Sequence, residues 1–105
     1  MSYRHFLRPS VGRFFWTKVD NMKRIGVVGI VIEGNRDVAM EVQKILSENG
    51  DIILGRMGIP DRENNISAIS LIVKGESERI SALTGKLGRL ERVIVKSALT
   101  SVEVE

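Results

Sequence analysis

The residues best placed for chemistry form a short turn, Gly34-Asn35-Arg36-Asp37, between an apolar run and a helical pattern. Asn35 or Asp37 can cap the helix that follows, and the backbone N–H groups of this turn stand at a helix N-terminus, where anions bind readily. Arg36 is either part of such an anion site or an ordinary solvated turn residue. Arg56 is a second candidate because it interrupts an apolar segment. It is either an anion contact at an interface or a charge that guards an exposed edge strand.

Enzyme chemistry finds little support elsewhere in the chain. Residues 22–105 contain neither histidine nor cysteine, which excludes Ser-His-Asp and Cys-His catalytic sets there. The single histidine, His5, lies in a segment that we place outside the fold, and the carboxylates of Asp61 and Glu63 fit a solvated turn. The remaining carboxylates and carbonyls suit hard cations rather than nickel, zinc or iron. We therefore expect a non-enzymatic protein with no catalytic residue, no cofactor and no tightly bound transition metal.

The first 21 residues differ from the rest of the chain in charge and in aromatic content. All the aromatic side chains lie there, namely Tyr3, Phe6, Phe14, Phe15 and Trp16. The same segment accounts for the net charge of +3, through Arg4, Arg8, Arg13 and Lys18 against Asp20. Pro9 and Gly12 break any helix in it. We expect residues 1–21 to form a tail outside the fold, and residues 22–105 to form a single domain.

Composition also bears on location and on nucleic-acid binding. No apolar run approaches the roughly 18 residues of a membrane helix, and the lack of cysteine fits a reducing cytosol, so we expect a cytoplasmic protein without a membrane partner. RNA-recognition modules stack bases on aromatics of their central strands, and the strands predicted at 23–33 and 66–74 have none. The alternative function that stays open is nucleic-acid binding through the basic aromatic tail.

The segment Lys23–Glu33 is the element around which the predicted fold is organised. It reads KRIGVVGIVIE, and its many β-branched residues and two glycines favour a strand over a helix. The apolar residues are continuous rather than alternating. This pattern predicts a strand that is buried on both faces and lies at the centre of a sheet.

The remaining chain alternates helical and strand patterns. The first predicted helix ends at Asn49 and has the buried face Val38, Val42, Ile45 and Leu46. Two strands follow at Asp51–Ile59 and Ile66–Lys74, joined by a polar loop at 60–65. A second helix has the apolar stripe Ile80, Leu83, Leu87 and Leu90, and a last strand at Val93–Leu99 is either prolonged by residues 100–105 or frayed there. Gly50 is predicted to end the first helix in a left-handed conformation, and Ser77 or Gly75 to cap the second. Gly85 and Gly88 each cost that helix about 1 kcal/mol relative to alanine, and close packing on a neighbour is one reason to have them.

The order βαββαβ predicts an α+β, ferredoxin-like fold. Its antiparallel sheet has strand order 4-1-3-2 and carries both helices on one face. Alternation along the third strand directs Ile69, Leu71 and Val73 to the helices. The residues that point away are Ile66, Ala68, Ser70 and Ile72. An apolar face of this kind is rare on a monomer, so we expect a homo-oligomer, either a dimer or a tetramer. The alternative is a monomer in which the aromatic side chains of the tail cover this face.

Three segments resemble a family described as regulators of the iron-only hydrogenase system. They are KRIGVVGIVIE, DIILGRMGIPDRENNISAISLIVKG and ISALTGKLGRLERVIVKSAL, and the similarity covers residues 22–99. The resemblance implies an ACT-like domain, related to the C-terminal domain of the nickel-responsive repressor, with a regulatory role through a protein partner. It also implies a small effector bound between subunits near the first strand–helix loop, which here means Gly34, Asn35, Arg36 and Asp37. Arg56 is the further anion contact that we consider for this effector. The histidine and cysteine ligands for the repressor's nickel and its ribbon–helix–helix arm are missing, so neither nickel sensing nor that mode of DNA binding carries over.

Overall fold

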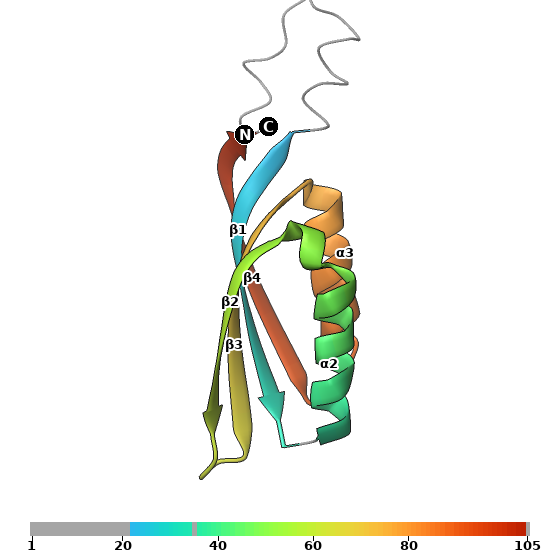
Figure 1. Ribbon diagram of the computed structural model, residues 1–105, viewed down its shortest axis with the longest axis vertical. Helices are drawn as coiled ribbons and strands as arrows, with labels where there is room; N and C mark the ends of the chain where they lie inside the picture. Colours follow the sequence, from blue (N-terminus) through green and yellow to red (C-terminus); the bar gives the residue numbers. More distant parts are fainter. Residues whose placement is uncertain (1–21, 35, 105) are drawn as a thin grey trace, which may run out of the picture.

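The computed structural model describes residues 22–34 and 36–104, which form a four-stranded sheet and two α-helices (Figure 1). The elements in chain order are β1 (Lys23–Glu33), α2 (Arg36–Glu48), the 3-10 turn η2 (Gly50–Ile52), β2 (Ile53–Asp61), β3 (Ile66–Gly75), α3 (Ser77–Gly88) and β4 (Val93–Val104). The sheet order is β2-β3-β1-β4 and every neighbouring pair is antiparallel. This confirms the predicted order 4-1-3-2. The predicted tail, residues 1–21, lies outside the described residues, as does Asn35.

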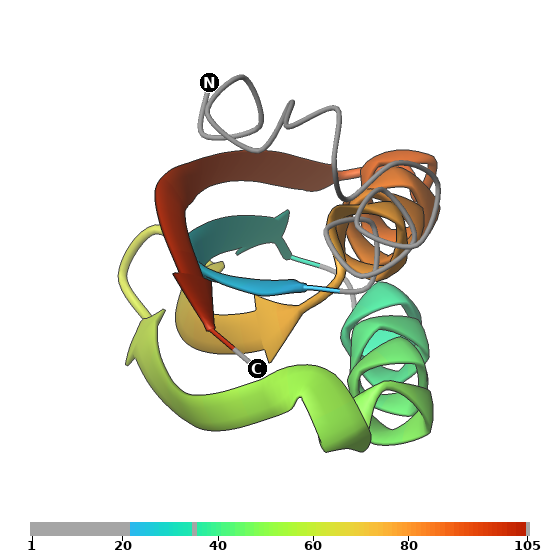
Figure 2. The same ribbon diagram turned by 90° about the horizontal axis from the view of Figure 1, so that it is seen from above.

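Both helices cover the same face of the sheet, as predicted, so the described residues form two layers (Figure 2). The core between the layers consists of aliphatic side chains from every strand and both helices. Its fully buried members are Val28, Ile30, Val42, Leu46, Leu71, Val73, Leu83 and Leu87. Among the described residues the core has no aromatic side chain, because all the aromatics of the chain fall in the first 21 residues.

Strand β1 lies at the centre of the sheet, between β3 and β4, as predicted. The prediction that it is buried on both faces is wrong for the single chain. Val28 and Ile30 are buried beneath the helices, whereas Val27 is 43% exposed and Gly29 is exposed. The continuous apolar pattern therefore has a different cause. One set of its residues fills the core, and the other faces outward where no helix covers the sheet.

The helical patterns are confirmed at their buried positions. Val42 and Leu46 of α2 and Leu83 and Leu87 of α3 are buried, and Leu90 packs against the core from just beyond α3. The predicted stop of the first helix and the predicted cap of the second are wrong, whereas the cap predicted for the first helix, Asn35 or Asp37, stays a prediction. Gly50 is not in the left-handed conformation and is the first residue of η2. The Nδ2 of Asn49 instead donates to the carbonyl of Ile45 at 2.9 Å, which satisfies one of the last carbonyls of α2.

Neither Gly75 nor Ser77 caps α3. Ser77 is its first helical residue, and the cap is Glu76, whose backbone carbonyl accepts from the N–H of Arg79 at 2.9 Å. Gly75 instead allows close packing, because a Cβ there would lie 3.1 Å from Cγ2 of Ile52, which would have to shift slightly. The expected close packing at Gly85 is not found within this chain, since a Cβ at that position would meet nothing within 4 Å, and the same holds at Gly88.

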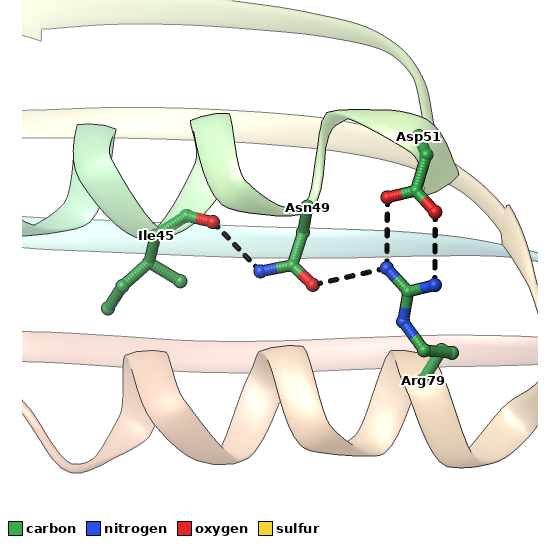
Figure 3. A network of polar contacts seen from close by, with 4 residues as sticks. All are labelled: Ile45, Asn49, Asp51 and Arg79. Atoms are coloured by element: carbon green, nitrogen blue, oxygen red, sulfur yellow. Dashed lines mark hydrogen bonds and ion pairs between the residues drawn. The ribbon is translucent and has the colours of Figure 1, made fainter.

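A polar cluster ties the end of α2 to the start of α3 (Figure 3). The Arg79 guanidinium donates to both oxygens of Asp51, at 3.0 and 2.9 Å, and its Nη2 also reaches Oδ1 of Asn49 at 3.4 Å. This two-pronged contact is the strongest reason that the Asp51 pKa lies below its usual value. It fixes η2 against the second helix at the end of the molecule opposite the β1–α2 turn.

Strand β4 continues to Val104, so the residues after Leu99 prolong the strand. Its last part pairs with the start of β1 after an irregularity between Arg24 and Gly26. There the hydroxyl of Thr100 donates to the carbonyl of Ile25 at 2.6 Å. Figure 2 shows this end of β4 curving away from the plane of the remaining strands.

Candidate functional site

The turn after β1 and the tip of the β2–β3 hairpin lie together at one end of the sheet. The N–H of Gly34 donates to the carbonyl of Asn65 at 2.7 Å, and Nδ2 of Asn65 lies 3.4 Å from the carbonyl of Gly34. Gly34 adopts a positive φ of 54°, and a Cβ on it would lie 2.5 Å from Nδ2 of Asn65. Glycine is therefore needed both for the backbone conformation and for the close approach of the hairpin.

A hollow of about 300 Å³ is open between these two segments and the start of α2. The apolar part of its lining consists of Ile32, Ala39, Pro60 and Ile66. The polar part includes Arg36, Asp61, Arg62, Asn65 and Ser67. We call this space the hairpin hollow. It combines an apolar surface with charged side chains, which is the usual composition of a site for a small molecule.

The charged groups of the hairpin hollow leave an excess of positive charge. Both oxygens of Asp61 are turned to Asn64, accepting from its side-chain amide at 2.9 Å and facing its backbone N–H at 3.4 Å. Among the described residues, the two ion pairs within 4 Å involve other arginines, and neither Arg36 nor Arg62 takes part. The positive charge of Arg36 and Arg62 is therefore not neutralised by a carboxylate of the described chain.

The structure brings together some of the predicted site residues and separates others. Gly34 and Arg36 line the hairpin hollow. Asp37 does not line it; it borders a shallow depression on the outer side of α2 instead. Asn35 lies outside the described residues, so its predicted role stays a prediction. Arg56 borders an adjoining hollow of about 160 Å³ that shares Pro60 and Ser67 with the first.

Arg56 already has a partner in its own chain. Its Nη2 donates to Oε1 of Gln43 on α2 at 2.6 Å, so the side chain lies along the helix-covered side of the edge strand β2. This contact holds the guanidinium next to the hairpin hollow rather than inside it. Both predicted roles, anion contact and edge-strand guard, are compatible with that position.

Two residues of the hollow, Arg62 and Asn65, were not predicted from sequence. Both belong to the polar loop at 60–65, which was interpreted only as a chain reversal. The pairing of Glu33 with Ile66 carries the missing information, because antiparallel pairing of β1 with β3 places the hairpin tip beside the turn that follows β1. The predicted strand order therefore implied this neighbourhood.

The second candidate surface is the side of the sheet that no helix covers, which we call the open sheet face. Its three central rows across the strands are Gly55, Ile72, Val27 and Ala98; Met57, Ser70, Gly29 and Lys96; and Ile59, Ala68, Val31 and Ile94. The large side chains are well exposed, with 63% for Met57 and 60% for Ile59. The middle of the face carries no large side chain on β1 or β3, since Gly29 and Ser70 lie side by side there. The alternation predicted for β3 is confirmed, because Ile69, Leu71 and Val73 are buried on the opposite side.

Within residues 22–34 and 36–104, no group of three or more histidine, cysteine or carboxylate side chains could hold a metal ion. None of the helices there has the length and hydropathy that crossing a membrane requires.

The fold and these two surfaces define a small α+β module with a cation-lined hollow at one end and an uncovered apolar sheet face. Residues 24–97 match the TM1266-like family model, described as "Iron-only hydrogenase system regulator, putative", and the chain belongs to this family. The resemblance seen in the sequence is thereby confirmed.

Two solved structures are similar to the chain. The uncharacterized protein TM1266 from Thermotoga maritima is 35% identical, with a TM-score of 0.73 over 75% of this chain and 99% of its own. An unknown protein from Galdieria sulphuraria is 13% identical, with a TM-score of 0.52 over 76% of this chain and 46% of its own, and shares the fold alone. No curated protein matches the chain.

Proposed function

We propose that the protein is a non-enzymatic, ACT-like regulator of the iron-only hydrogenase system. It binds a small effector in the hairpin hollow, assembles as a homo-oligomer through the open sheet face, and acts on a regulatory protein partner. The family description supports the regulatory role. The position of the hollow supports effector binding, because it opens at the turn that the sequence independently singled out.

The observation that carries this proposal is that the β2–β3 hairpin belongs to both surfaces. Pro60 and Ser67 line the hairpin hollow, whereas Ile59 and Ala68, one residue away along each strand, lie on the open sheet face. A ligand that fixes the hairpin changes the surface available for assembly. If the ligand changes the association constant of the oligomer by some factor, assembly changes the affinity for the ligand by the same factor.

Assembly through the open sheet face follows from its composition. Exposed Val27, Met57, Ile59, Ile72 and Ile94 form a continuous apolar surface across the strands. The lack of a large side chain at Gly29 and Ser70 leaves room for a second sheet to approach closely. Face-to-face packing of this kind closes with two-fold symmetry, so it produces a dimer by itself or a tetramer when combined with edge-to-edge pairing.

Light scattering on the full chain tests the assembly. Replacing exposed Ala68 by arginine places a charge in the middle of the open sheet face, and we expect the oligomer to dissociate. Lys44→Arg, a conservative change on the outer side of α2, is the control and should leave the mass unchanged. A wild-type monomer at micromolar concentration, with or without residues 1–21, would overturn this part of the proposal.

The second candidate function is nucleic-acid binding, favoured by the concentration of basic and aromatic residues in the first 21 positions. It predicts an oligonucleotide affinity that falls steeply with salt and disappears when the chain begins at Met22. Fluorescence anisotropy with a labelled single strand distinguishes the two functions, because the regulator proposal predicts no dependence on residues 1–21.

A further inference from the structure

We infer that the effector of the hairpin hollow is a small organic anion, with its anionic group between Arg36 and Arg62 and a short apolar body against the apolar side chains of the lining. This inference rests on the proposed function and adds the chemical class of the ligand. It is drawn from the charges, size and lining of the hollow.

The anionic group follows from the two arginines. They come from different elements, Arg36 from the first turn of α2 and Arg62 from the hairpin tip, yet both line the same hollow. Both positive charges border one hollow, and within the described residues neither arginine forms an ion pair within 4 Å. Asp61, the acidic residue of the same lining, is hydrogen-bonded to Asn64 instead. An anion that bridges the two arginines supplies the missing negative charge, and guanidinium groups bind carboxylate and phosphate in this way.

The apolar body follows from the apolar part of the lining. Ile32, Ala39, Pro60 and Ile66 border the same space as the two arginines. A bare inorganic ion would leave these side chains in contact with water. The volume of about 300 Å³ lies at the lower end of the range for ligand sites, which favours a small metabolite.

The competing explanation is that Arg36 and Arg62 are ordinary solvated side chains. Both residues are exposed, and many surface arginines have no carboxylate partner. The two explanations differ in an observable way. A solvated pair does not select anions over neutral molecules of the same shape, and its removal changes the binding of no small molecule.

Amide chemical shifts of the full-length protein, measured by NMR at constant ionic strength, test the inference. The probes are acetate, butyrate and hexanoate, with butyramide as the neutral counterpart of butyrate. We expect the amide signals of Gly34 and Asn65 to move on titration with butyrate, and its dissociation constant to be at least tenfold lower than that of butyramide. From acetate to butyrate the affinity should rise about fourfold for each added methylene group, because each one is buried against the apolar side chains of the hollow.

The variants Arg36→Gln and Arg62→Gln should each weaken butyrate binding at least tenfold. The matched control is Arg89→Gln, which removes an exposed arginine at the end of α3 that does not line the hollow. Equal binding of butyrate and butyramide, unchanged affinity in both hollow variants, or shifts that avoid Gly34 and Asn65 would each overturn the inference. An affinity that does not depend on the chain length of the carboxylate would overturn the inference that the ligand has an apolar body.

The failure of this inference can be distinguished from failure of the proposed function. A neutral or cationic molecule that moves the Gly34 and Asn65 signals would overturn the anion assignment and leave effector binding intact. A wild-type chain that stays monomeric in light scattering would overturn the proposed assembly, whatever the charge of the ligand.

Discussion

Replacing Gly34 by alanine should cost more stability than any other single added methyl group in the β1–α2 turn. The positive φ of Gly34 costs an alanine about 1–2 kcal/mol. The new Cβ would lie 2.5 Å from Nδ2 of Asn65, the end of an exposed side chain, which must turn aside and lose its 3.4 Å contact with the Gly34 carbonyl. The backbone carbonyl oxygen of Asn65 would lie 3.5 Å from the Cβ, an ordinary contact, so the hydrogen bond that it accepts from the N–H of Gly34 is kept. The expected loss in the free energy of unfolding is therefore about 1–2 kcal/mol, set mainly by the positive φ.

Urea unfolding at a single protein concentration measures this loss, since an oligomer's stability depends on concentration. The control is Gly50→Ala, because a Cβ at Gly50 meets nothing within 4 Å and its φ is not positive. It should be neutral or slightly stabilising through the lower entropy of the unfolded chain. The double variant with Asn65→Gly removes the clash and keeps a residue suited to the φ of 56° there, so it should recover part of the loss. If Gly34→Ala unfolds within 0.5 kcal/mol of the Gly50 control (about the error of such measurements), the argument for this contact is wrong.

Three further outcomes are expected. Gly85→Ala should stabilise the chain by about 1 kcal/mol in chemical unfolding, because no atom within 4 Å would contact the added methyl group. A loss of stability instead would mean that a second molecule packs on α3 there. Asp51→Asn should lower the melting temperature slightly at pH 7 and have no effect well below pH 3.8. Arg79 lowers the pKa of Asp51 in the folded state. The contribution of Asp51 to stability is therefore present above its unfolded-state pKa and is lost as the pH falls through its folded-state pKa. A chain that begins at Met22 should melt within a few degrees of the full chain, and a large drop would show that residues 1–21 pack on the domain.

The fold could be predicted almost completely because its determinants are periodic. Alternation in β3 and the spacing of Leu83 and Leu87 fixed which side chains face the core, and the short connections limited the strand order. Apart from the outward face of β1, which is exposed in the single chain, the wrong predictions concern single backbone positions. Gly50 has the composition of a left-handed stop, but the Asn49 side chain satisfies the Ile45 carbonyl instead, and no pattern encodes that choice.

The candidate site was predicted only in part, because it is built from two segments far apart in the sequence. The turn containing Gly34 and Arg36 could be recognised from its own residues. Arg62 could not, since a polar hairpin tip has the same composition whether or not it borders a site. Asp37 was assigned to the site for its position in the sequence, whereas the helix turns it to the outer side of α2. Proximity in the chain was a weaker guide than strand pairing.

The pairing of Lys23 with Val104 has a practical consequence for protein engineering. The first and last residues of the described domain stand side by side, and the 11 residues of β1 separate them from the hairpin hollow by about 35 Å. An Asn-Gly dipeptide that joins Val104 to Lys23 would convert β4 and β1 into a hairpin with a two-residue turn. The chain could then be reopened between α3 and β4 to give a circular permutant. A reporter joined directly to Lys23 or Val104 would emerge at the far end of the sheet, away from any ligand bound beside Gly34 (Figure 1).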